Sequence, residues 1–285
     1  MSNKNGVLYV VATPIGNLSD ISARATEVLR GVDLIAAEDT RHSRPLLRHL
    51  GVGTPLLALH EHNEHQALNK VISCLKGGGS VAIISDAGTP LISDPGFALV
   101  RECHREGITV SPVPGPSAAI CALSVAGLAT DRFLFEGFPH RNRSARRTQM
   151  EALRNECHTM VFYESSHRVQ ASLRDMAEIF GEQRPAVVAR ELTKLHETLL
   201  HGTLGSLCET MSQDPMQSKG EFVLLVAGAG PVHEDALGVE VERVLGILLE
   251  ELPLKKAAAV AARLTGAKKN RLYQLGLELR RKMDD

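Results

Sequence analysis

The sequence predicts an α/β protein made of two α/β domains, residues 1–128 and 129–235, followed by a small helical unit at residues 236–285. In the first domain, short apolar runs rich in β-branched residues alternate with helical patterns, which is typical of a parallel sheet covered by helices. The second domain repeats this alternation, but two of its strands follow each other closely, which indicates a mixed sheet. The last unit contains only helical patterns, and a Gly-containing turn between two of them favours a helix-turn-helix-like arrangement.

The strands of the first domain are expected to be buried on both faces, because Val7–Ala12 is apolar at every position except the Tyr9 hydroxyl. Further strands are expected at 32–37, 56–59, 81–84 and 108–110, with helices near 21–29, 44–50, 63–76, 95–105 and 118–126. In the second domain, strands are expected at 133–136, 159–163, 186–189, 197–200 and 222–227, with helices at 144–155, 165–180 and 203–212. The helices of the last unit are expected at 241–249, 254–264 and 268–280.

Basic residues gather in two stretches, although the formal net charge of the whole chain is only −1. Residues 253–285 carry nine Lys or Arg against three acids, and residues 139–154 carry five Arg against one Glu. Phosphate contacts act at short range in salt, so the binding of a polyanion depends on such local patches. We therefore expect contacts with an RNA backbone despite the nearly neutral total.

Several classes of protein are disfavoured by what the sequence lacks. Five cysteines are scattered without a CxxC pair, which argues against a disulfide framework or a zinc knuckle. No apolar stretch approaches the length of a membrane span, and the first residues lack the features of a signal peptide. The sequence has no GxGxxG after its first strand, no GxxxxGK[ST] and no GxSxG. We expect a cytoplasmic protein with no membrane partner.

Loops rich in Gly, Pro and Ser follow several predicted strands of both domains. In an open parallel sheet, ligands bind at the carboxyl ends of the strands, where loops and helix N-termini present free N–H groups. Ordinary turns would explain any one of these loops, but all of them together favour a ligand cleft. The loops are Thr13–Asn17, Ser85–Pro90, Pro114–Ala119 and Lys219–Glu221.

The order of seven motifs, spread over most of the chain, resembles that of the tetrapyrrole methylase superfamily, and within it the branch that acts on ribosomal RNA of the small subunit. The motifs are Thr13-Pro14-Ile15-Gly16-Asn17, Ala37-Glu38-Asp39-Thr40-Arg41, Ser85-Asp86-Ala87-Gly88-Thr89-Pro90, Pro114-Gly115-Pro116, Phe162-Tyr163-Glu164-Ser165, Ala189-Arg190-Glu191-Leu192-Thr193-Lys194 and Lys219-Gly220-Glu221. The C-terminal Leu252-Pro253-Leu254-Lys255-Lys256 extends the resemblance to the last unit.

This resemblance implies two α/β domains of the class III methyltransferase type, with S-adenosylmethionine in the cleft between them, and a homodimer. It also implies methyl transfer to the ribose 2′-hydroxyl of a cytidine in the decoding region of 16S rRNA, free or in the small ribosomal subunit. Small-molecule members usually carry Gly-Asp-Pro after the fourth strand, where this chain has Ser85-Asp86-Ala87-Gly88. Two alternatives stay open, namely a methylase of a precorrin-like small molecule and a non-catalytic RNA-binding module.

The resemblance assigns the donor site to loop residues of both domains. They are Pro14, Ser85, Asp86, Ala87, Gly88, Pro90, Ser117, Ala118, Tyr163, Leu192 and Gly220. Asp86 is expected to accept a hydrogen bond from the donor's ammonium group, and its alternative role is to cap the next turn. Ser117 and Ala118 begin a helix, where free N–H groups can bind the donor's carboxylate.

A ribose hydroxyl is a poor nucleophile, so we expect a nearby acid to accept its proton. The sequence does not choose among the four acids that its motifs bring forward, Glu38, Asp39, Glu164 and Glu191. Basic residues beside them are expected to hold phosphate, and these are Arg41, Arg190 and Lys194. For Glu191 and Lys194 the alternative is a plain ion pair. The reaction is an in-line displacement, so no metal is expected.

The two basic stretches supply the candidate RNA contacts. They are Arg141, Arg143, Arg146, Arg147, Lys255, Lys256, Lys268, Lys269 and Arg271. For Arg141–Arg147 the alternative is a solvated linker face. The spacing of His60, His62 and His65 allows a metal site, and Cys157-His158 allows a weaker one, but neither comes with the other ligands that such a site needs. We expect solvated loops there.

Overall fold

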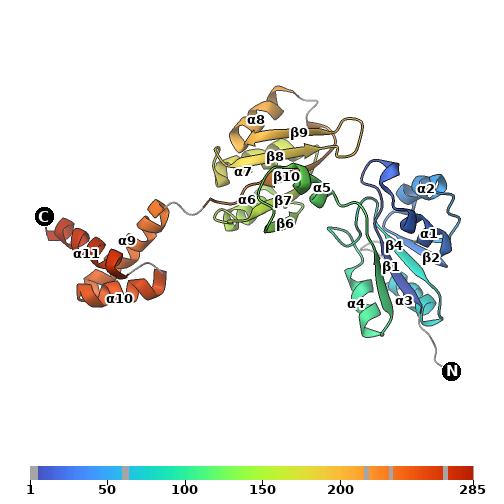
Figure 1. Cartoon of the computed structure of the whole chain (residues 1–285), viewed down its shortest axis with the longest axis horizontal. Helices are drawn as coiled ribbons and strands as arrows, with labels where there is room; N and C mark the ends of the chain where they lie inside the picture. The colour runs from blue at the N-terminus through green and yellow to red at the C-terminus, as the bar shows by residue number, and fades with distance from the viewer. Residues whose placement is uncertain (1–5, 60–63, 215–217, 231–233, 266–268, 285) are drawn as a thin grey trace. The chain divides into compact units, whose positions relative to one another are not determined.

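The computed structural model describes residues 6–59, 64–214, 218–230, 234–265 and 269–284. The chain forms two compact units, Met1–Gly228 and Ala229–Asp285 (Figure 1). The described residues of the first unit hold two five-stranded sheets. The domain boundary predicted at residue 128 falls between the last strand of the first sheet and the first strand of the second, and it remains a prediction.

The first sheet is parallel throughout, as predicted, with the strand order β3-β2-β4-β1-β5 (Figure 1). Its strands are β1 (Val7–Val11), β2 (Leu34–Ala37), β3 (Leu56–Ala58), β4 (Val81–Ile84) and β5 (Thr109–Val113). The last of these runs through Pro112, beyond the predicted end at Val110. Because β5 is an edge strand, it tolerates a residue that lacks an N–H group.

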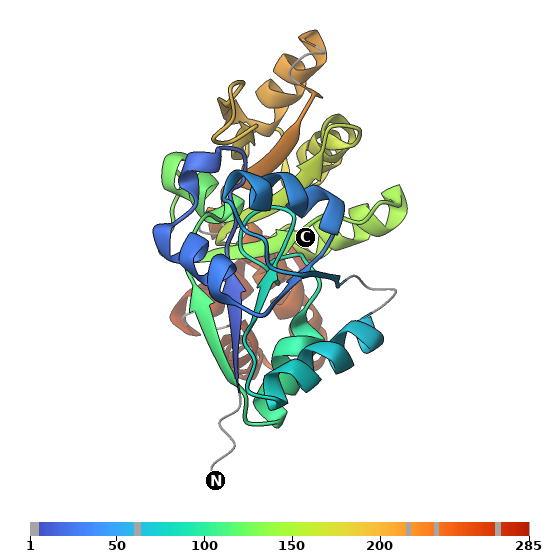
Figure 2. The ribbon, with the colours of Figure 1, turned by 90° about the vertical axis from the view of Figure 1, so that its right-hand side faces the viewer.

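Helices cover both faces of this sheet (Figures 1 and 2). On one face, α1 (Ala23–Gly31) and α2 (Thr40–His49) bury Leu29 and Leu47, and on the other, α3 (Glu64–Lys76) and α4 (Phe97–Arg105) bury Leu75 and Leu99. A short 3-10 helix, η1, spans Leu18–Asp20. Helix α2 begins before the predicted Arg44, because the Asp39 side chain accepts a hydrogen bond from the Arg41 N–H and caps it.

The second sheet is mixed, as predicted, with the order β6-β7-β10-β8-β9. Its strands are β6 (Phe133–Gly137), β7 (Thr159–Ser165), β8 (Pro185–Arg190), β9 (Thr198–Thr203) and β10 (Glu221–Val226). Strands β6 and β7 are parallel, and the other neighbours are antiparallel. Strand β7 stays paired with β10 up to Ser165, so the next helix begins at Val169 rather than at the predicted residue 165.

Helix α5 (Ala118–Val125) packs on one face of the second sheet, through Ala119, Ala122 and Leu123. The other face is covered by α6 (Arg143–Ala152), α7 (Val169–Phe180) and α8 (Leu204–Gln213). Helix α5 directly follows β5 of the first sheet. Its N-terminal end therefore lies where the two sheets meet.

The second unit is helical, as predicted, with α9 (Glu234–Glu251), α10 (Leu254–Thr265) and α11 (Lys269–Asp284). Leu245, Ala257 and Leu272 come from the three helices and share one buried cluster. Helix α11 approaches α10 closely at Gly276, where a Cβ atom would lie 2.4 Å from Cδ1 of Leu254. Among the described residues, no helix is both long enough and apolar enough to cross a membrane.

Candidate active site

All four of the loops singled out in the sequence contribute to one cavity of about 540 Å³ in the first unit. The loop after β1 contributes Ile15, the loop after β4 contributes residues 86–89, and the start of α5 contributes Ser117 and Ala118. The second sheet adds residues from β7, β8 and β10 and from the loops beside them. The cavity is therefore built by both sheets.

Backbone hydrogen bonds join the loops after β1 and β4 at the cavity wall. The N–H of Thr13 donates to the carbonyl of Gly88 over 2.8 Å, and the N–H of Gly88 donates back over 3.1 Å. Gly88 has a φ of +81°, and a Cβ atom there would lie 3.3 Å from Cγ2 of Ile15. Glycine thus provides both the left-handed backbone and the close approach that hold the two loops together.

Asp86 lines the cavity and braces the neighbouring loop at the start of α2. Its Oδ1 accepts a hydrogen bond from the N–H of Asp39 at 3.2 Å, and its Oδ2 lies 2.9 Å from Nδ1 of His42. The bond to Asp86 raises the pKa of His42 above its usual value. Asp86 therefore has a structural role, but it supports a neighbouring loop and does not cap its own turn as the alternative had expected.

The four candidate acids differ sharply in their surroundings. Glu38 lines the cavity, and burial, followed by the charge of Asp86, raises its pKa. Asp39 lies outside the cavity lining and is held by Arg41, whose guanidinium and N–H lower its pKa strongly. Glu191 also lies outside the lining and contacts Lys194, whose Nζ is 3.0 Å from both Glu191 and Glu221. The plain ion pair that the sequence allowed for Glu191 and Lys194 is thus formed.

Glu164 lines the cavity but is buried and fully engaged by the protein. Its oxygens accept hydrogen bonds from Ser172 Oγ at 2.5 Å and from the N–H of Ser165 at 2.8 Å, and Arg168 lies 2.7 Å away. These partners leave it poorly suited to accept a substrate proton. Arg168, which no sequence pattern indicated, forms the ion pair with this buried carboxylate.

The start of α5 lines the cavity with Ser117 and Ala118. Ser117 is the N-cap residue, but its side chain makes no capping hydrogen bond. The N–H of Ala119 donates to the Tyr163 hydroxyl at 3.2 Å, which joins α5 to β7. The Tyr163 ring packs edge-on against Phe135 and Phe138, with centroids 5.0 and 5.5 Å away. A helix start of this kind suits a carboxylate or another anion.

The cavity includes most of the predicted donor residues and several that sequence analysis missed. Of the predicted set, Pro14, Ser85 and Pro90 do not line it. Ser85 instead donates its hydroxyl to the carbonyl of Ala87 at 3.2 Å and so shapes the loop. The lining residues that lie outside every predicted loop and motif are Ile92, Ser93, Asp94, Phe138, Ser166, Phe222 and Val223. The Pro- and Gly-containing run Ser93–Gly96, two residues after the predicted loop, was the signal that could have indicated Asp94.

The loop that carries Asp94 has an uncommon backbone. Leu91 and Ser93 have φ values of 70° and 69°, and Gly96 has a φ of 122°. Oδ2 of Asp94 is a buried atom with no hydrogen-bond partner. Burial, with the nearby charge of Glu38, raises the pKa of Asp94 to about 6. Positive φ at non-glycine residues is costly and persists where the surrounding structure holds it, often at functional sites.

Three arginines of the 139–154 stretch contact acidic side chains of α7. Arg146 is 4% exposed, and its Nε and Nη2 donate to Oδ2 of Asp175 at 2.9 and 2.6 Å. Arg143 and Arg147 each lie 3.2 Å from Oδ1 of Asp175, and Arg147 also contacts Glu178. Arg146 is therefore committed to the protein interior, and we do not assign it to RNA. Arg141 stands outside this network.

The predicted contacts of the helical unit lie on α10 and α11. Lys255, Lys256, Lys269 and Arg271 are exposed, whereas Lys268 lies outside the described residues. The histidines at positions 60 and 62 also lie outside them, and the side chain of His65 is not described.

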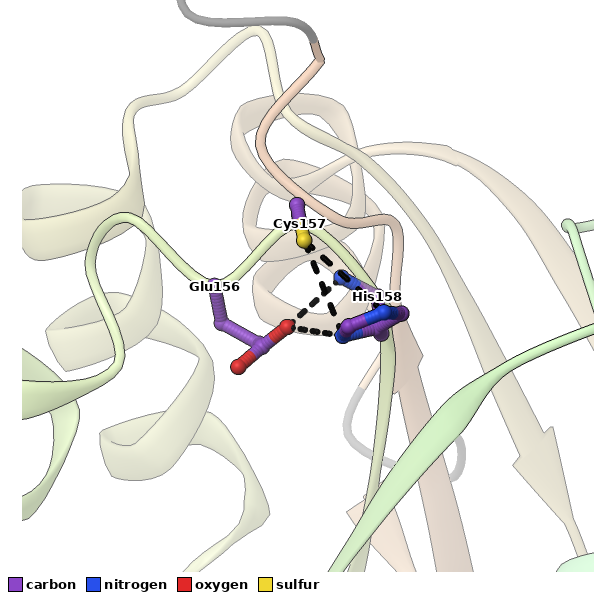
Figure 3. A group of neighbouring side chains, drawn as sticks. All are labelled: Glu156, Cys157 and His158. Carbon is purple, nitrogen blue, oxygen red and sulfur yellow. Dashed lines mark hydrogen bonds and ion pairs between the residues drawn. The ribbon is translucent and has the colours of Figure 1, made fainter. Parts of the chain in front are cut away.

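Glu156, Cys157 and His158 form a compact group whose possible metal-binding atoms lie within 4.8 Å of one another (Figure 3). The carboxylate of Glu156 accepts a hydrogen bond from the N–H of His158 at 2.8 Å and lies 2.5 Å from Nδ1 of the same residue. Both contacts lie within three consecutive residues and stabilise the turn between α6 and β7. In the described part of the chain no further ligand joins them, and we assign the group a local structural role.

Comparison with protein families gives two matches that together span most of the chain. The family described as Tetrapyrrole (Corrin/Porphyrin) Methylases matches residues 7–208. The family described as the RsmI C-terminal HTH domain matches residues 235–280. These matches confirm the fold that the sequence predicted, including the helix-turn-helix-like unit.

Two relatives share about half of their residues with this chain. The Ribosomal RNA small subunit methyltransferase I of Pseudomonas aeruginosa is 56% identical over 274 residues, which cover 96% of this chain and 97% of that protein. The protein of the same name from Escherichia coli O157:H7 is 51% identical over 276 residues, which cover 97% and 96%.

Solved structures share the fold at low sequence identity. Cobalt precorrin-4 methyltransferase, CbiF, gives a TM-score of 0.58 at 16% identity, covering 78% of this chain and 94% of that one. Uroporphyrin-III C-methyl transferase from Thermus thermophilus, complexed with S-adenyl homocysteine, gives 0.56 at 14% identity, with 78% and 97% covered.

Proposed function

Since this chain belongs to the tetrapyrrole (corrin/porphyrin) methylase family, we propose that it transfers a methyl group from S-adenosylmethionine to the ribose 2′-hydroxyl of a cytidine in 16S rRNA. The observation that carries this proposal is the agreement with the rRNA methyltransferases over nearly their whole length, helical unit included. A ribosomal substrate also suits a cytoplasmic enzyme. The family resemblance adds a homodimer, which sedimentation velocity would test.

The cavity between the two sheets fits the methyl donor in size and in chemistry. Its volume of about 540 Å³ lies within the range of small-molecule sites. The free N–H groups at the start of α5 suit the donor's carboxylate, and the carboxylates of Glu38 and Asp86 suit its positive groups. Leu192 and Gly220 supply an apolar wall on the side of the second sheet. When bound, S-adenosylmethionine supplies a methyl group on a positively charged sulfur.

The residues of this chain then have to bring a ribose to that methyl group and remove its proton. Holding the reacting atoms at near-attack distance supplies roughly 7–11 kcal/mol of the barrier reduction. Of the four acids predicted from the sequence, Glu38 is the one that lines the cavity without an ion pair to another described residue. Arg41, Arg190 and Lys194 do not line the cavity, so a role for them on phosphate would lie at its margin.

Contacts to the rRNA backbone are proposed for exposed basic residues of both units. In the helical unit these are Lys255, Lys256, Lys269 and Arg271, together with Lys268. In the first unit Arg141 is the strongest candidate, because Arg143 and Arg147 share the carboxylates of Asp175 and Glu178. Loss of such a contact weakens binding and lowers its dependence on salt.

Two rival functions are separated from this one by a single set of measurements. Calorimetry measures binding of S-adenosylmethionine, and a tritiated methyl group then reports transfer to small ribosomal subunits or to bare 16S rRNA. Donor binding with label on RNA supports the proposal. Donor binding with no label on either form of RNA favours a methylase of a precorrin-like molecule. Absence of donor binding favours a non-catalytic RNA-binding module.

A further inference from the structure

A second cavity, of about 610 Å³, adjoins the first, and the two share Phe138 and Ser165. It is formed by the loop after β6 and by the turn between β7 and α7. Its described lining contains two arginines and two histidines and no acidic residue. The lining residues are Phe138, Pro139, His140, Arg141, Ser165, His167 and Arg168.

The positive groups of this second cavity differ in how far the protein already uses them. Arg168 contacts the carboxylate of Glu164 at 2.7 Å, and its Nη1 donates to the carbonyl of Pro139 at 3.0 Å, so it is fixed in place. Arg141 is exposed and, among the described residues, has no acidic side chain within ion-pair distance. An exposed guanidinium beside a fixed one matches the geometry of a phosphate.

Phe138 stands on the wall between the two cavities. Its side chain is 54% exposed, and its ring meets Tyr163 edge-on at 5.5 Å with 63° between the planes. Because Tyr163 contacts the Phe138 ring edge-on from one side, the other face of the Phe138 ring stays open. A single-stranded base stacks on such an aromatic face without regard to its sequence.

We infer that the second cavity is the substrate subsite, in which Arg141 binds the phosphate attached to the target ribose while Phe138 stacks its base. This inference rests on the proposed function. The 3′-phosphate of a nucleotide is attached to the ring carbon next to the one that carries the 2′-hydroxyl. A ribose at the donor cavity therefore places this phosphate beside it, where the structure provides cations.

Equilibrium binding of bare 16S rRNA and of small subunits at several salt concentrations tests the phosphate contact. Arg141→Gln is compared with Arg48→Gln, which removes one exposed arginine of α2 that lines neither cavity. We expect Arg141→Gln to weaken binding and to lower the salt slope by about one unit, with unchanged donor affinity. Equal effects of the two variants would overturn the phosphate assignment.

Substitutions of Phe138 test the stacking contact. Phe138→Trp should keep methylation, whereas Phe138→Leu should lower RNA affinity about tenfold or more, with unchanged salt slope and donor affinity. Equal activity of the Leu and Trp variants would overturn the stacking assignment. If the wild-type protein neither binds nor methylates rRNA, the proposed function itself fails, which is a different outcome from all of these.

A second, independent observation concerns Asp94 in the first cavity. Its Oδ2 is buried without a partner, although buried polar atoms are nearly always hydrogen-bonded. The loop that holds it is kept in a costly backbone conformation at Leu91 and Ser93. A Cβ atom at Gly137 of the second sheet would lie 2.9 Å from Oγ of Ser93, so the loop is clamped from the opposite sheet. The fold thus holds Oδ2 of Asp94 without a hydrogen-bond partner although this loop conformation is unfavourable, and such an atom is suited to bind a ligand.

We propose that Asp94 is the group that accepts the proton of the ribose hydroxyl, a step that again rests on the proposed function. The 2′-oxygen forms its bond to the methyl carbon, the carbon–sulfur bond breaks with its electron pair going to sulfur, and the hydroxyl proton passes to Oδ2 of Asp94. The charged and titratable groups around Asp94 are Glu38, Asp86 and Tyr163.

Asp94→Asn removes the acceptor while keeping the shape of the side chain. We expect single-turnover methylation to fall about 100-fold or more, with a donor dissociation constant that stays within about twofold of the wild type. In the wild type the rate should rise with pH through about 6, and Glu38→Gln should move this rise to lower pH because it removes a nearby negative charge. Weakened donor binding by Asp94→Asn, with normal turnover at saturation, would overturn the proposal.

Discussion

Asp175→Ala is expected to cause a large loss of stability in the first unit. The Asp175 side chain is 1% exposed and faces three guanidinium groups, one of which, on Arg146, is itself 5% exposed. Although burial raises the pKa of Asp175, its hydrogen bonds from Arg146, Arg143 and Arg147 lower it overall, so the carboxylate is charged in the folded protein. Its removal leaves the Arg146 charge buried without compensation.

The expected cost follows from the burial of that remaining charge. Breaking a buried ion pair by removing one partner costs about 3–5 kcal/mol, whereas replacing both partners by apolar residues is often neutral or stabilising. We therefore expect Asp175→Ala to lower the free energy of unfolding of the first unit by about 3–5 kcal/mol. The double variant Arg146→Met/Asp175→Leu should recover most of this loss.

Urea unfolding followed by circular dichroism measures both variants, and filter binding measures their affinity for rRNA. The double variant should bind rRNA like the wild type, because the Arg146 side chain is inside the protein. A loss below about 1 kcal/mol for Asp175→Ala, or weak rRNA binding by a stable double variant, would refute the structural role that we give to Arg146.

Three further predictions concern the site and the helical unit. Asp86→Ala should weaken binding of S-adenosylmethionine in calorimetry and abolish turnover, since it removes a cavity carboxylate and the brace on the Asp39 N–H; unchanged donor affinity would remove Asp86 from the site. Asp94→Asn should raise the Tm at pH 8, because a carboxyl whose pKa is 3.8 when unfolded and about 6 when folded costs stability as the pH rises through this interval. The gain should vanish below about pH 3, where the carboxyl is mostly protonated in both states, and a gain independent of pH would contradict this. Lys255→Glu/Lys256→Glu should impair rRNA binding in a filter assay with unchanged donor affinity, and normal methylation by this variant would show that the exposed face of α10 does not contact RNA.

The sequence predicted the strands and their parallel or mixed character because buried apolar runs such as Val81–Ile84 leave few alternatives. The ends of the elements were less predictable, since they depend on tertiary partners. Strand β7 continues to Ser165 because Glu221 of β10 pairs with it, and α2 begins early because the side chain of Asp39 caps it.

The loops that form the site were predictable, because their composition is distinctive. The side-chain partners within the site were not, because they depend on the folded structure. The loops rich in Gly and Pro were found from composition, and all of them line the cavity. The run Ser93–Gly96 could have indicated the loop of Asp94, but that its Oδ2 lacks a hydrogen-bond partner follows only from the surrounding fold. Likewise, a run of arginines does not say that Arg146 faces Asp175 on another helix while Arg141 faces solvent.

Transfer of a tritiated methyl group from S-adenosylmethionine to 16S rRNA, followed by alkaline hydrolysis, tests the central claim most directly. A methylated 2′-oxygen cannot attack the neighbouring phosphate, so the label should appear in a single alkali-stable dinucleotide that begins with cytidine, and Asp86→Ala should eliminate it. Label in mononucleotides, which would mean methylation of a base, or no transfer to RNA by a protein that binds the donor, would contradict the account.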